Sequence, residues 1–161
     1  MMLLHLLRHA HAGDPEAWDG PDAARPLSEK GVAQAERLGS FLATIAFKTD
    51  AVITSPKVRA ARTAEIVAGH LGVAVTEEDG LAGALDLEAL EALLARADDP
   101  ERPVIVGHDP DFSELLSLLC DTENVTMRKG ALAKIEVDRP LRAGGGTLRW
   151  LIPPDALRPD R

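Results

Sequence analysis

Short apolar runs alternate with segments of helical periodicity along the chain, and this alternation constrains the fold more than any other feature. Leu3–Leu7, Ala51–Ile53 and Pro103–Gly107 are apolar at nearly every position, as expected of strands buried on both faces of a parallel sheet. Two later stretches, Ala131–Val137 and Thr147–Ile152, are typical of strands joined by a glycine-rich turn. The sequence therefore predicts an α/β fold, a three-layer α/β/α sandwich with a mostly parallel central sheet.

The intervening helices are expected to begin at residues whose side chains cap a helix, with proline at the first helical position in two cases. The four expected caps are Ser28, Ser55, Asp86 and Asp109. The whole chain, 1–161, is predicted to be one domain. Its proline-rich and polar tail, 153–161, is expected to fray.

Charge and cysteine content exclude several classes of partner. The net charge of −8 disfavours binding to nucleic acid or to an anionic membrane. The only cysteine, Cys120, cannot form an internal disulfide. The apolar run at the N-terminus is too short for a membrane span and lacks the flanks of a signal peptide. These features favour a cytoplasmic protein.

Cationic and imidazole side chains follow three of the predicted strands. Arg8 and His9 follow the first, Arg59 lies shortly after the second, and His108 follows Pro103–Gly107. In an open parallel sheet the strand-to-helix loops meet in one crevice beyond the carboxyl ends of the strands. Two guanidinium groups and two imidazoles in one crevice suit a phosphoryl group, because arginines grip its oxygens and a neutral imidazole can attack phosphorus.

Each of these residues taken alone has a simpler interpretation. A lone histidine at a strand end is more often a polar group near the surface. Arg59 could pair with Glu65, and Asp109 is most simply a helix cap. A functional site is favoured only because all of these residues follow strands at equivalent positions.

Four ordered blocks resemble the histidine phosphatase superfamily. Arg8-His9-Ala10 is similar to its Arg-His-Gly signature, with alanine in place of glycine. Arg25–Ala35 resembles the segment that opens its first helix, and Ser55–Glu65 resembles its second arginine motif, with Arg62 where glutamine is common. Val106–Pro110 is similar to its second histidine motif. The set spans nearly the whole chain and most resembles the SixA-related phosphohistidine phosphatase branch, which has a phosphoglycerate mutase-like fold.

The resemblance implies a role for each matching residue. His9 is the nucleophile, Arg8 and Arg59 hold the phosphoryl oxygens, and His108 donates to the same group. No metal or other cofactor is required. The implied substrate is phosphohistidine on a partner protein, and inorganic phosphate is a product. A phosphatase of small phosphate esters, diphosphates or nucleotides is the alternative.

The sequence departs from the family where many members carry a glutamate as general acid. Asp14 and Asp86 are candidate proton donors, although a turn before Pro15 and a helix cap are simpler roles for them. The lack of a general acid slows the hydrolysis of esters more than that of N–P bonds, because an imidazole leaving group is much less basic than an alkoxide. This favours phosphohistidine as the substrate.

Two further arginines, Arg25 and Arg62, could widen the positive field around the pocket. If both face it, a diphosphate or nucleotide substrate becomes plausible. A surface position or an ion pair is the simpler interpretation of Arg62, which lies three residues after Arg59 and therefore on the same helix face.

Two other classes of function remain open. His9-Ala10-His11 after a strand resembles a two-histidine metal site, but no carboxylate-and-histidine set completes it, and the chain is too short for the barrel hydrolases that use one. A non-catalytic phosphate-binding module is the other class, and the presence of both His9 and His108 gives no reason to require it.

Overall fold

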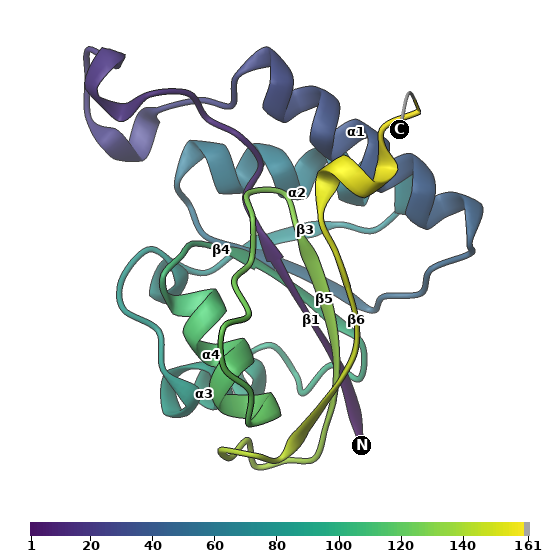
Figure 1. Ribbon diagram of the computed structural model, residues 1–161. Helices are drawn as coiled ribbons and strands as arrows, with labels where there is room; N and C mark the ends of the chain where they lie inside the picture. The colour runs from purple at the N-terminus through teal and green to yellow at the C-terminus, as the bar shows by residue number, and fades with distance from the viewer. Residues whose placement is uncertain (160–161) are drawn as a thin grey trace.

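The computed structural model describes residues 1–159 and shows a six-stranded sheet between two helical layers (Figure 1). The strands lie in the order β3-β2-β4-β1-β5-β6. Their bounds are β1 Met2–Arg8, β2 Ala51–Thr54, β3 Val75–Glu77, β4 Pro103–Gly107, β5 Leu132–Val137 and β6 Gly146–Ile152. The pairs among β1, β4, β2 and β3 are parallel, and β5 pairs antiparallel with both β1 and β6. The predicted sandwich with a mostly parallel sheet is confirmed.

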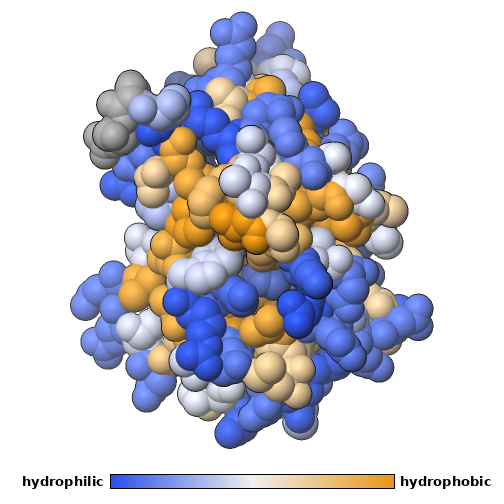
Figure 2. Space-filling model, turned by 90° about the vertical axis from the view of Figure 1, so that its right-hand side faces the viewer, coloured by the Kyte–Doolittle hydropathy of each residue, from blue (hydrophilic) through white to orange (hydrophobic). Residues whose placement is uncertain are grey.

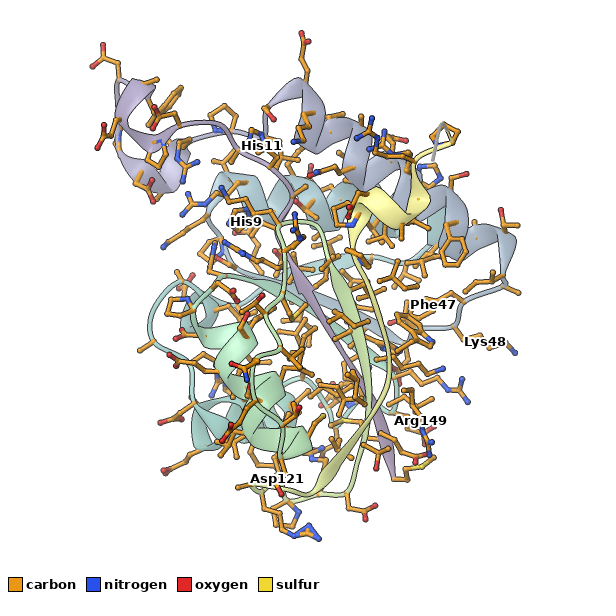
Figure 3. The ribbon with its side chains drawn as sticks, in the orientation of Figure 1. His9, His11, Phe47, Lys48, Asp121 and Arg149 are labelled. Atoms are coloured by element: carbon orange, nitrogen blue, oxygen red, sulfur yellow. The ribbon has the colours of Figure 1, made fainter. Side chains whose placement is uncertain are left out.

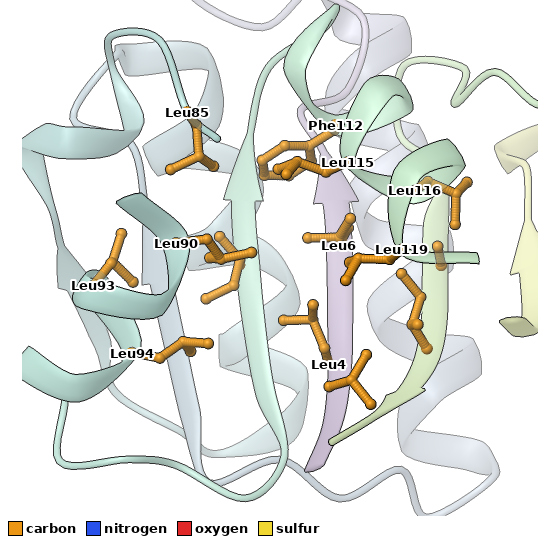
Figure 4. Close-up of a cluster of buried hydrophobic side chains, with 14 of the residues drawn as sticks. Leu4, Leu6, Leu85, Leu90, Leu93, Leu94, Phe112, Leu115, Leu116 and Leu119 are labelled. Atoms are coloured by element: carbon orange, nitrogen blue, oxygen red, sulfur yellow. The ribbon is translucent and has the colours of Figure 1, made fainter. Parts of the chain in front are cut away.

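Helices cover both faces of this sheet. They are α1 Glu29–Thr44, α2 Val58–Leu71, α3 Leu87–Arg96 and α4 Asp111–Cys120. Alternate residues of β1 point to opposite layers: Leu4 and Leu6 pack with α3 and α4, and Leu7 packs with α1 and α2. Figure 4 shows the first of these cores, in which leucines of α3 and α4 cover β1 and β4.

The sheet edge at β6 is only partly covered, and its residues alternate between half-buried and exposed over most of the strand. Figure 2 shows the face of the molecule that lies to the right in Figure 1, where hydrophobic side chains form a band between hydrophilic regions. Trp150 of β6 lies in an aromatic group with His5 and Phe47.

Two of the four expected helix caps are confirmed, those at Ser28 and Asp86. The Ser28 hydroxyl accepts from the backbone N–H of Gly31 at 3.1 Å, and the Asp86 carboxylate accepts from that of Ala89 at 2.8 Å. Ser55 is not the cap of α2, which begins three residues later at Val58. α4 begins after Pro110, and the Asp109 carboxylate instead accepts from the backbone N–H of Ser113.

The tail differs from its expected frayed form. Pro154–Leu157 make a 3-10 turn, η4, and Pro154 is buried where this turn packs against α1. Burial of an apolar ring against α1 orders a segment whose composition alone indicates disorder. Residues 160–161 of the predicted tail lie outside the described residues.

Candidate active site

The carboxyl ends of β1, β4 and β2 lie side by side because these strands are neighbours in the sheet. Arg8 pairs with Gly107, so the next residues, His9 and His108, leave adjacent strands together. The His9 N–H donates to the Gly107 carbonyl at 3.0 Å, and the Ser55 N–H donates to the Val106 carbonyl at 3.0 Å. The three loops singled out from the sequence therefore meet at one edge of the sheet.

His9 lies at the end of β1 and is 6% exposed (Figure 3). Its Nδ1 is 2.8 Å from the Ala10 carbonyl oxygen, which requires Nδ1–H as the donor. Burial is the main cause that lowers the pKa of His9 to about 3, and the nearby His108, Arg59 and Arg8 act in the same direction. The imidazole is therefore neutral at pH 7, and its Nε2 carries the lone pair that a nucleophile needs.

His108 stands beside His9, with 5.3 Å between the ring centroids. Its Nε2 lies 2.7 Å from the Ser55 hydroxyl oxygen. Burial lowers the pKa of His108 to about 4, with Lys57 and Arg59 acting in the same direction. A phosphoryl dianion next to this ring would raise that pKa and favour the protonated, donating form.

Arg8 is fixed by the loop that precedes β5 and by the start of the α4 segment. Its Nη1 donates to the Met127 carbonyl at 2.7 Å and lies 3.4 Å from Asp109 Oδ2. Asp109 in turn accepts from the Ser113 hydroxyl at 2.6 Å, and that hydroxyl accepts from the Met127 N–H. The guanidinium is thus held in one orientation at the rim of the site.

Arg59 lies in the first turn of α2 and is 6% exposed. It is not paired with Glu65. Its two terminal nitrogens instead donate to Asp22, one to the carboxylate at 2.9 Å and one to the backbone carbonyl at 2.8 Å. A second contact anchors the helix turn: Thr63 donates its hydroxyl to the Arg59 carbonyl and accepts from the Ala10 N–H.

Buried donors without partners gather at this place. Among the described residues, five buried side-chain nitrogens have no hydrogen-bond partner. Three of the five belong to the site: Arg8 Nε, Arg59 Nε and His108 Nδ1. Arg8 Nε and Arg59 Nε are donors, and His108 Nδ1 is one when the ring is protonated. Since an unpaired buried donor is costly, the two arginine donors beside a neutral imidazole suit the binding of an anion.

The other two arginines singled out from the sequence are held by carboxylates, Arg25 at the border of the site through Asp22 and Arg62 on the surface of α2. Arg25 is buried, but its guanidinium is occupied by Asp22 and by the Ala12 and Gly13 carbonyls. Arg62 is half exposed and lies 3.7 Å from Glu65 on the surface of α2. The condition that both arginines face the pocket is not met.

The two candidate proton donors act as caps in this structure. The Asp14 carboxylate accepts from the Glu16 N–H at 2.9 Å in an exposed 3-10 turn. Asp86 caps α3. Their assignment as proton donors stays a prediction.

Sequence reasoning missed two residues of the site, Asp22 and Ser55. Asp22 lies in a 3-10 turn far along the chain from Arg59, and no local pattern links the two. The Arg25 hydrogen bond lowers the pKa of Asp22, and Arg59 adds to the effect, so the carboxyl is ionised. Ser55 resembled a helix cap, and its hydroxyl is instead shared between His108 and the Lys57 N–H.

The described residues contain no group of three or more His, Cys, Asp or Glu side chains placed to hold a metal ion. Over the same residues, no helix combines the length and apolar character of a membrane span.

Comparison with known proteins places the chain among phosphatases. The sequence profile of the Histidine phosphatase superfamily (branch 1) matches residues 4–115. Phosphohistidine phosphatase SixA of Escherichia coli is 25% identical over 98% of this chain and 97% of its own. An 8-oxo-(d)GTP phosphatase of Mycolicibacterium smegmatis is 30% identical over 93% of this chain, which spans only about half (48%) of that relative.

A solved structure has the same architecture. The protein histidine phosphatase SixA complexed with tungstate superposes with a TM-score of 0.81. The superposition covers 98% of this chain and all of that one, at 24% identity. The likeness therefore extends over the sheet and both helical layers described above.

Proposed function

This chain belongs to branch 1 of the histidine phosphatase superfamily and is a hydrolytic phosphatase, and we propose that it works through a covalent phosphohistidine on His9. The observation that carries this proposal is the neutral, oriented imidazole of His9 among Arg8, Arg59 and His108. These groups supply a nucleophile and three donors for the phosphoryl oxygens.

The reaction has two steps. His9 Nε2 attacks phosphorus, a new N–P bond forms, and the bond from phosphorus to the leaving group breaks. Water then attacks the phosphorus of phospho-His9, which releases inorganic phosphate and restores the imidazole. Arg8, Arg59 and His108 neutralise the charge on the phosphoryl oxygens in both steps, so positioning and preorganised charge lower the barrier.

We further propose that the substrate is phosphohistidine on a partner protein. The carboxylates beside the two catalytic arginines are ion-paired: Asp22 contacts Arg59 at 2.9 Å, and Asp109 lies 3.4 Å from Arg8. An ionised carboxylate held by arginine is a poor proton donor for an alkoxide. An imidazole leaving group needs such a donor less, because it is much less basic than an alkoxide.

The test compares hydrolysis of a histidine-phosphorylated protein with that of an aryl phosphate ester. We expect the wild-type protein to prefer the N–P substrate and His9→Ala to lose at least about a thousandfold in turnover on both. His70→Ala is the matched control, because that imidazole lies on the surface against Glu36. Equal rates for wild type and His9→Ala would overturn the mechanism.

The alternative substrate class is small phosphate compounds, which the similarity to the 8-oxo-(d)GTP phosphatase favours. The same assay separates the two classes. Hydrolysis of the ester without hydrolysis of protein phosphohistidine would keep the role of His9 and move the substrate to small molecules.

A further inference from the structure

A cavity of about 780 Å³ opens next to the proposed catalytic site. Its lining residues come from α1, the end of β1, the loop before β5 and the 3-10 turn η4. Figure 1 shows how these elements are arranged. The lining includes five cations and one carboxylate, that of Asp155; a sixth cation, Arg158, stands at the same turn, and the five are Arg8, Lys30, Arg37, Arg128 and Lys129. Since the chain carries a net charge of −8, such a concentration of cations runs against the charge of the whole molecule. We call this cavity the cationic groove.

The cations line two opposite walls of the cationic groove. Lys30 and Arg37 lie on one face of α1, two turns and about 10 Å apart along the helix axis. Arg128 and Lys129 belong to the loop on the other side. That loop is tied to the end of β1, because the Gly130 N–H donates to the Arg8 and His9 carbonyls at 3.1 and 2.9 Å. The groove therefore begins at the rim of the catalytic site and runs away from it along α1.

The cations of the groove repel one another. Desolvation, together with Arg8, Arg25, Arg59 and Lys30, lowers the pKa of Lys129. Arg37 Nε is buried and has no hydrogen-bond partner among the described residues. An anion in the groove would weaken the repulsion between the cations and would accept a hydrogen bond from the unpaired donor.

We propose that the cationic groove binds an acidic segment of the partner protein, whose aspartate and glutamate side chains flank the phosphohistidine. This inference rests on the proposed function for its partner. The charges are spread over about 10 Å, a distance that three residues of extended chain cover. Compact phosphate recognition instead uses convergent donors, as at Arg8, Arg59 and His108. The lining holds no Phe, Tyr or Trp side chain on which a nucleobase could stack, and His11 is its one aromatic ring.

The first arm of the test measures binding of a fluorescein-labelled, unphosphorylated hexaglutamate peptide by fluorescence anisotropy at low salt. The variant is Lys30→Gln/Arg37→Gln, which leaves the proposed catalytic residues intact. Lys48→Gln/Arg142→Gln is the control, because it removes the same charge elsewhere: Lys48 lies far from His9 in Figure 3. We expect the groove variant to bind at least about tenfold more weakly and the control to stay within about twofold of wild type.

The second arm measures turnover of two phosphohistidine peptides, one flanked by glutamates and one by glutamines. We expect the groove variant to raise KM for the glutamate peptide about tenfold, with kcat unchanged, and to leave both constants unchanged for the glutamine peptide. A merely structural effect of the substitutions would change both peptides alike.

Three outcomes separate the possibilities. Equal loss of hexaglutamate binding in the groove variant and the control overturns the proposal. Tighter binding of tripolyphosphate than of hexaglutamate, lost in the groove variant, also overturns it and assigns the groove to small polyphosphates. Groove-dependent hexaglutamate binding without any hydrolysis of phosphohistidine supports the groove as a site for acidic segments and overturns the proposed substrate alone.

Discussion

Asp22 shares its carboxylate between two buried guanidinium groups, at 2.9 Å from Arg59 and 3.1 Å from Arg25. The same Arg59 is proposed to hold a phosphoryl group. On that proposal the carboxylate would compete with phosphate for Arg59. Its negative charge also acts on His108 and offsets part of the lowering of that pKa. The Asp22 backbone carbonyl, which also accepts from Arg59, does not depend on the side chain.

We expect Asp22→Asn to strengthen the binding of inorganic phosphate about five- to tenfold, because it removes a competing charge and keeps the backbone contact. Product inhibition of aryl phosphate hydrolysis measures this affinity. Asp19→Asn, in the same exposed loop, is the control. Weaker phosphate binding in Asp22→Asn would instead show that the carboxylate positions Arg59.

At the residue scale, the sequence could identify side chains that follow strands but not those that arrive from elsewhere. Arg8 ends β1, and His9 and His108 directly follow β1 and β4, so the neighbouring order of these strands brings the three together. Asp22 reaches Arg59 from a turn between β1 and α1, and that contact depends on the path of a loop without hydrophobic periodicity. The surface position of Arg62 was the simpler interpretation of the sequence and is the observed one.

The contact between α1 and the segment after β1 is unusually close at one residue. A Cβ placed on Gly31 would lie 1.9 Å from the His11 carbonyl oxygen, so only glycine fits there. The same carbonyl accepts from the N–H and the hydroxyl of Ser28, which holds the start of the helix against the segment.

We therefore expect Gly31→Ala to lower the free energy of unfolding by about 3 kcal/mol, because backbone has to move. Urea denaturation measures the change through the midpoint. Gly69→Ala is the matched control in α2: a Cβ there meets nothing within 4 Å, and alanine is expected to stabilise the helix by about 0.5–1 kcal/mol. Similar midpoints for the two variants would contradict the close contact.

At the element scale, long apolar runs were predictable and short elements were not. β4 occupies the predicted Pro103–Gly107. β3 was missed because it has three residues, two of them exposed, and so no apolar pattern. α2 starts later than its serine and proline indicate, since the Ser55 hydroxyl serves His108. For β3 and for the start of α2, a tertiary contact decided what local propensity could not: the pairing of β3 with β2 and the hydrogen bond of Ser55 with His108.

Buried histidines make the stability of the whole molecule depend on pH. His5 is 1% exposed, donates from Nδ1 to the Pro103 carbonyl at 3.0 Å, and has its pKa lowered to about 4, mainly by burial. The unfolded chain takes up this proton near pH 6.5, whereas the folded protein resists it until about pH 4. Stability is therefore complete above pH 6.5 and is lost as the pH falls from there toward 4.

The loss from His5 alone is on the order of 3 kcal/mol, and His9 and His108 act in the same direction. We expect His5→Gln, which keeps a donor but does not titrate, to flatten the dependence of the urea midpoint on pH between 6.5 and 4. Parallel slopes for wild type and His5→Gln would exclude His5 as the cause.

The place of β1 in the sheet delays its pairing with other strands while the chain is being synthesised. Leu6 pairs with Ile105 on one side and Ala133 on the other, so the first strand made lies between two that come much later. At ribosomal rates the apolar β1 waits about ten seconds for both neighbours. During that interval it is a target for chaperones or for aggregation, and a pause in translation before β5 would lengthen the exposure.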